Sequence, residues 1–108
     1  MARLELDRDA ADRTFPATRG DEVVLALPET PTSGYRWSLD AYDPQVLSLA
    51  GDDFQPAAGG AMGGGGVRTF RFVARGAGAT RIRLARRRPW EATGGAERFE
   101  TTIDVGPR

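Results

Sequence analysis

Three segments in the second half of the chain alternate apolar and polar residues, and this pattern constrains the fold more than any other feature. They are residues 67–74, 81–85 and 99–105. A period of two is typical of strands with one buried face, and no stretch sustains the 3.6-residue period of an amphipathic helix. The sequence therefore predicts an all-β fold. The residues expected to face inward are Phe70, Phe72, Ala74, Ile82, Leu84, Phe99, Thr101, Ile103 and Val105.

Shorter strand candidates precede these segments at residues 4–6, 22–27, 35–39 and 46–49. Each is followed by Gly, Pro, Asp or Thr, the residues that commonly end strands and form turns. About seven short strands at roughly even spacing favour an immunoglobulin-like antiparallel β-sandwich. A small β-barrel is the structural alternative.

A glycine-rich stretch at residues 55–66 reads either as a linker between two domains or as a loop within one. With only 108 residues in the chain, a linker here would leave two halves that are each too small to bury a stable core. An apolar content of 40% and a charged content of 28% are ordinary for a globular protein. We therefore expect an internal loop and a single domain over residues 1–108.

The chain contains no cysteine and no histidine. Disulfides, thiolate nucleophiles and Cys-ligated metals are excluded, and so are mechanisms that need a histidine base. We expect no metal and no cofactor, and an enzymatic interpretation would depend on carboxylates.

Charge and hydropathy bear on partners and location. Basic and acidic residues are balanced at 15 each, so no global field attracts nucleic acid or an anionic membrane. No apolar run reaches the roughly 20 residues that span a bilayer, and residues 1–7 lack the apolar region of a signal peptide. We expect a cytoplasmic protein as written, or a periplasmic or secreted one if a leader was trimmed.

Three loop segments stand out from the strands, and each alone has an ordinary structural explanation. In residues 30–35, Pro31 and Gly34 could simply form a tight turn. The glycines at residues 63–66 could serve a wide turn. Trp90, after Pro89, could be a core aromatic at the end of a strand.

Taken together and in order, these segments resemble the chagasin family, whose members inhibit papain-like cysteine proteases. The family's first motif reads Asn-Pro-Thr-Thr-Gly-Tyr and, after one intervening residue, Trp; residues 30–35 and Trp37 match it at all but two positions. The second, Gly-x-Gly-Gly with a Phe four residues on, matches residues 63–66 and Phe70. The third, Arg-Pro-Trp, is intact at residues 88–90, and the resemblance spans residues 21–105.

The departures from the family pattern have physical consequences. Thr30 replaces the usual Asn, and its hydroxyl closes a local turn more weakly than an amide does. Ser33 replaces Thr with the loss of one methyl group, from which little should follow. Arg86 stands where an aromatic is usual, so we expect a more cationic base for the third loop and a shift in which protease is preferred.

The resemblance implies a non-enzymatic, monomeric inhibitor that binds its protease one-to-one, with three loops at one end of the sandwich entering the active-site cleft. Thr32 would sit over the catalytic cysteine, and the glycines would offer backbone contacts as an added strand does. Trp90 and Arg88 would be anchors, residue types common at interfaces. The implied protease-binding residues are Thr30, Pro31, Thr32, Ser33, Gly34, Tyr35, Gly63, Gly64, Gly65, Gly66, Arg88, Pro89 and Trp90.

Three other functions compete with the inhibitor interpretation. An immunoglobulin-like binding or adhesion module explains the strands but not the three motifs. Nucleic-acid binding is suggested by the arginines at 81, 83 and 86–88, yet Arg81 and Arg83 alternate with apolar residues as the wet face of a strand does. A glycosidase needs two carboxylates across a cleft, whereas Asp52 and Asp53 are adjacent and alternate sides on a strand.

Overall fold

The computed structural model describes residues 2–30, 34–56, 65–88 and 97–107. Within them the chain forms strands and one turn of 3₁₀-helix, in the order β1 (Arg3–Leu6), η1 (Arg8–Ala10), β2 (Thr14–Ala17), β3 (Glu22–Glu29), β4 (Arg36–Ala41), β5 (Leu47–Pro56), β6 (Gly66–Ala74), β7 (Gly78–Arg87) and β8 (Glu97–Val105). No helix in this part of the chain is long and apolar enough to cross a membrane.

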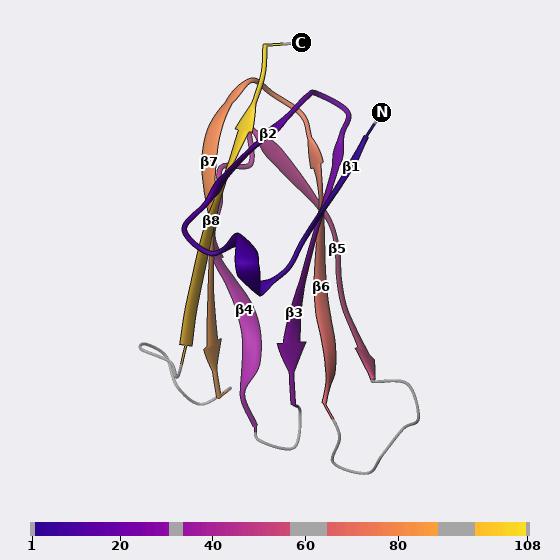
Figure 1. Ribbon diagram of the computed structural model, residues 1–108, viewed down its shortest axis with the longest axis vertical. Helices are drawn as coiled ribbons and strands as arrows, with labels where there is room; N and C mark the ends of the chain where they lie inside the picture. The colour runs from indigo at the N-terminus through magenta and orange to yellow at the C-terminus, as the bar shows by residue number, and fades with distance from the viewer. Residues whose placement is uncertain (1, 31–33, 57–64, 89–96, 108) are drawn as a thin grey trace.

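The strands form two four-stranded sheets that pack face to face (Figure 1). One sheet has the order β1-β3-β6-β5 and the other the order β2-β8-β7-β4. The long strands pair antiparallel, while the short strands β1 and β2 pair parallel with β3 and β8. The predicted all-β sandwich is therefore confirmed.

The alternation in the last three strands places their side chains as predicted. In β6, Phe70 and Phe72 are buried while the intervening Arg71 is half-buried. Ile82 in β7 and Ile103 in β8 are also buried, and side chains from both sheets form one core cluster. The period of two thus fixes which face of each strand joins the core.

β2 is not among the strands predicted from the sequence, and β5 is longer than predicted. Pro16 lies within β2, and a proline cannot donate to a ladder, so it argues against a strand except at the edge of a sheet. β2 is such an edge strand, beside β8. β5 continues to Pro56, well past the predicted residues 46–49, because its pairing with β6 extends along its mostly exposed second half. That half shows no apolar alternation, since Phe54 is its one large apolar side chain.

Strand ends that flank the three candidate loops lie together at one end of the sandwich (Figure 1). The register shows the same arrangement, since Glu29 at the end of β3 pairs with Gly66 at the start of β6, and Pro56 of β5 also pairs with Gly66. In the other sheet, Arg36 at the start of β4 pairs with Arg87 at the end of β7. The start of β1 and the end of β8 lie at the opposite end.

Candidate functional site

The first candidate loop connects β3 to β4, across the two sheets. Its described residues are Thr30, Gly34 and Tyr35, all half-buried. Gly34 has a φ of +82°, in the left-handed region that favours glycine, which confirms the role predicted for it in the turn. Pro31, Thr32 and Ser33 lie outside the described residues.

Trp37 anchors β4, the strand that follows this loop. It is 5% exposed, and its indole Nε1–H donates to the carbonyl oxygen of Pro28 at 2.8 Å. Trp37 therefore belongs to the core. Because Pro28 is in β3 and Trp37 is in β4, this hydrogen bond ties together the two strands that carry the first loop.

A buried ion pair lies directly beneath the first two loops. Glu29 is 2% exposed and Arg68 is 8% exposed, and the Nη2 atom of Arg68 lies 2.9 Å from Oε2 of Glu29. The other carboxylate oxygen of Glu29 accepts a hydrogen bond from the backbone N–H of Trp37 at 2.7 Å. Glu29 therefore links the end of β3 to the starts of β4 and β6.

Arg68 completes this network on the side of β5. Its Nη1 atom lies 3.0 Å from a carboxylate oxygen of Asp52, and its guanidinium lies over the ring of Phe54, 5.6 Å from the centroid. Burial alone would lower the pKa of Arg68, but the hydrogen bonds to Glu29 and Asp52 outweigh it and raise that pKa above its ordinary value. The guanidinium is therefore held in its charged form with most of its donors satisfied.

Close packing beside the first loop accounts for the last two glycines of the second motif. A Cβ atom on Gly65 would lie 3.3 Å from Oγ1 of Thr30, and one on Gly66 would clash with the carbonyl oxygen of Gln55 and lie 2.6 Å from Cζ of Phe54. Gly66 is moreover paired on both sides within its sheet, so a structural reason for glycine exists there without a protease. Gly63 and Gly64 lie outside the described residues, and the protease contacts of all four remain predictions.

The third loop starts from arginines that stack on the first loop. The guanidinium of Arg88 lies 4.5 Å from the ring centroid of Tyr35, and that of Arg86 lies 6.0 Å from the same ring and 5.8 Å from Trp37. Arg86 also forms an ion pair with Glu97 at 3.2 Å. Glu97 also pairs with Arg8 at 2.8 Å, so one carboxylate is shared by two arginines and offsets only part of the positive charge at the loop base. Arg86 thus contributes to joining the first and third loops. Pro89 and Trp90 lie outside the described residues.

Arg87, between these two arginines, binds the edge of β4. Its two terminal nitrogens lie 2.8 and 3.0 Å from the carboxylate oxygens of Asp40, and one of them also donates to Oγ of Ser38 at 2.9 Å. The hydrogen bonds from Arg87 hold the pKa of Asp40 below its usual range. The end of β7 is therefore fastened to β4 by a bidentate pair.

Sequence reasoning missed Glu29 and Arg68, the two buried charges of the site. One signal was present for Arg68. It lies two residues before Phe70 and four before Phe72, so the alternation of β6 places it on the inward face. An arginine on an inward face implies a buried carboxylate partner. Glu29 likewise continues the inward alternation of Val23, Leu25 and Leu27 in β3. The two positions are 39 residues apart, however, and no sequence signal pairs them.

The arrangement does not favour the competing functions. Arg81 and Arg83, the basis of the nucleic-acid interpretation, lie 3.7 and 2.9 Å from the carboxylate of Glu100. Asp52, one of the two candidate glycosidase carboxylates, is bound to Arg68. Among the described residues, no group of three or more acidic side chains is placed to hold a metal ion.

Comparison with known protein families places most of the chain in one family. Residues 17–105 match the family described as "Chagasin family peptidase inhibitor I42". The chain is 25% identical to amoebiasin-1 of Entamoeba histolytica over 104 residues, which cover 94% of this chain and 99% of that protein.

Two solved structures share the fold. The crystal structure of the cysteine protease inhibitor EhICP2 from Entamoeba histolytica has a TM-score of 0.81 at 21% identity, with 96% of this chain and 95% of that chain covered. The structure of PbICP-C in complex with falcipain-2 has a TM-score of 0.65 at 15% identity, with both chains fully covered.

Proposed function

The chain belongs to the chagasin family of peptidase inhibitors, and we propose that it inhibits papain-like cysteine proteases by inserting three loops from one end of its sandwich into the active-site cleft. The inhibition is reversible, non-covalent and one-to-one. A wedge of this kind needs no catalytic group on the inhibitor, in keeping with a chain that has neither cysteine nor histidine.

The observation that carries this proposal is the way in which the three loop bases are joined. The buried carboxylate of Glu29 connects the first loop to the second through Arg68, and the ring of Tyr35 connects the first loop to the third through Arg88. Loops that are held in one arrangement before binding lose less conformational entropy when they bind. The contacts thus favour a preformed wedge.

Within this wedge each loop has a different task. Thr32, in the middle of the first motif, would cover the catalytic cysteine of the protease without presenting a scissile peptide to it. Gly63 and Gly64 would let the backbone of the second loop approach the protease closely. Trp90, which follows Pro89 in the sequence, would supply a rigid apolar contact on the other side together with Arg88.

The non-covalent mechanism is tested with a papain-like protease whose catalytic cysteine is replaced by alanine. The inhibitor should bind this variant with an affinity similar to that for the active enzyme, and mass spectrometry should find it uncut after long incubation with the active enzyme. Trypsin, a serine protease, is the control and should keep its full activity. Cleavage between Thr30 and Gly34 with loss of inhibition would show a substrate-like mechanism and contradict the proposal.

A further inference from the structure

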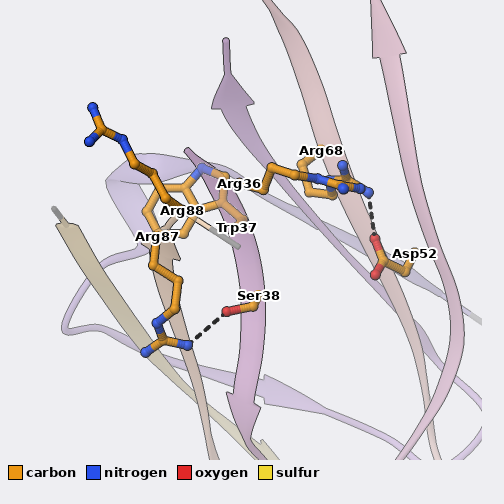
Figure 2. Close-up of a pocket in the computed structure, with 7 residues that line it drawn as sticks. All are labelled: Arg36, Trp37, Ser38, Asp52, Arg68, Arg87 and Arg88. Carbon is orange, nitrogen blue, oxygen red and sulfur yellow. Dashed lines mark hydrogen bonds and ion pairs between the residues drawn. The ribbon is translucent and has the colours of Figure 1, made fainter. Parts of the chain in front are cut away.

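A pocket of about 300 Å³ opens on the flank of the sandwich, beside the bases of the first and third loops. It lies between β4 and the end of β7 in one sheet and β5 and β6 in the other. Figure 2 shows the residues that line it, which are Arg36, Trp37, Ser38, Asp52, Arg68, Arg87 and Arg88. Four of these seven side chains are arginines and one is a carboxylate, although the whole chain is neutral.

Two of the four arginines are balanced within the fold. Arg68 is bound by Glu29 and Asp52, and Arg87 is bound by Asp40. These pairs make the wall of the pocket rigid. A third arginine, Arg88, lies over the ring of Tyr35.

Arg36 differs from the others in its surroundings. It is exposed, and its side chain takes part in none of the hydrogen bonds or ion pairs within the part of the chain that the structure describes. In Figure 2 it extends from β4 across the pocket toward Arg68 and Asp52, whereas Arg88 turns away from them. Because Arg68 and Arg87 already have carboxylate partners, the unmatched charge among these three guanidiniums is that of Arg36, and an anion from outside could pair with it.

We propose that this pocket receives an aspartate or glutamate side chain from the rim of the protease cleft, with the guanidinium of Arg36 as its main hydrogen-bond donor. This inference rests on the proposed function, because Arg36 directly follows Tyr35 and a protease seated on the loops would cover it. A guanidinium matches a carboxylate with two parallel hydrogen bonds. Covering the pair with protein reduces the solvent screening that makes exposed pairs weak.

A consequence of this assignment is selectivity. Arg36 occupies the position between Tyr35 and Trp37, where the first motif specifies no residue type. The three loops would then recognise what papain-like proteases share, while Arg36 would favour those with an acidic side chain next to the cleft. Discrimination by one charge at the border of an interface acts on both the association rate and the affinity.

The test compares Arg36→Gln and Arg36→Glu with Arg19→Gln against papain-like proteases whose cleft rims range from acidic to basic. Arg19 is a matched control, since it is also exposed and lies in the turn that precedes β3, at the opposite end of that strand from the loops. For proteases with an acidic rim we expect Arg36→Gln to raise the inhibition constant about 5- to 30-fold. Arg36→Glu should raise it further, the effect should shrink at high salt, and Arg19→Gln should have none.

A double-mutant cycle locates the partner, because neutralising one rim carboxylate of the protease should abolish the effect of Arg36→Gln. All three variants should melt as the parent does, because both positions are exposed. Equal inhibition constants for Arg36→Gln and Arg19→Gln across every protease would overturn the inference and leave the proposed function intact. A parent protein that inhibits none of these proteases would instead overturn the proposed function, and this inference with it.

Discussion

The carboxylate of Glu29 and the guanidinium of Arg68 form a buried ion pair at 2.9 Å, between the strand that enters the first loop and the strand that leaves the second. A buried pair of this kind costs desolvation energy and is weak evidence for stability. Its position suggests another role, since a second oxygen of Glu29 also receives the backbone N–H of Trp37. The pair holds the start of the first loop beside the end of the second.

Glu29→Gln should lower the free energy of unfolding by about 3 kcal/mol, because it leaves Arg68 buried with Asp52 as its remaining carboxylate. The glutamine can still accept the hydrogen bond from the backbone N–H of Trp37, so the lost stability reports the removal of the Glu29 charge. Denaturant titration measures it. Glu100→Gln is the control, since the Glu100–Arg83 pair at 2.9 Å is exposed and should cost less than about 1 kcal/mol. Equal losses in the two variants would mean that burial of the pair has no energetic consequence.

Gly66→Ala should destabilise the fold by about 1–3 kcal/mol through overpacking against the backbone of Gln55 and the ring of Phe54. Gly51→Ala is the matched control in the same sheet, because its Cβ would meet only the tip of the flexible Arg71 side chain, 2.8 Å away. We expect a change within about 0.5 kcal/mol for that variant. Melting temperatures of the two variants and the parent measure these changes. A Gly66→Ala protein as stable as the parent would assign that glycine to protease contact alone.

The two tryptophans should respond oppositely to truncation. Trp37→Ala should cost roughly 3–5 kcal/mol of folding free energy, because Trp37 is buried. Trp90→Ala should leave the melting temperature nearly unchanged and weaken protease binding by about 2–4 kcal/mol, as loss of an interface anchor does. The melting temperature and the inhibition constant are measured for both variants. A strongly destabilised Trp90→Ala with unchanged affinity in its folded fraction would assign Trp90 to the core.

Asp40→Asn should change how stability depends on pH. The hydrogen bonds from Arg87 lower the pKa of Asp40 in the folded state, so the pair stabilises the fold fully above the unfolded pKa of about 3.9 and loses its effect as pH falls through the lower folded value. The parent should therefore exceed the variant in stability at neutral pH, and the difference should shrink below about pH 4. Because Asp40 is partly exposed, the difference should be small and should fall with added salt. A difference that does not vary with pH would contradict the assignment.

The sequence predicted those parts of the structure that depend on local patterns. Alternation identified the inward residues of β6, β7 and β8, because each has one face in the core, and a left-handed turn at Gly34 followed from its residue type. β2 gave no such signal, because it is a short edge strand that contains Pro16.

The contacts that join the loop bases could not be predicted, because they depend on strand register. Glu29 meets Arg68 through the pairing of β3 with β6, and Arg86 meets Glu97 through the pairing of β7 with β8. Without the register, Arg86 looked like an added surface charge. The positions of the three candidate loops followed from the motifs, whereas the network beneath them required the fold.

The central claim is tested most directly by titrating papain of known active-site concentration with the purified protein. Residual activity should fall linearly and reach zero near one inhibitor per enzyme, and dilution with excess substrate should restore it. Trypsin under the same conditions should keep its activity. Papain that stays fully active in a tenfold excess of the protein would contradict the account.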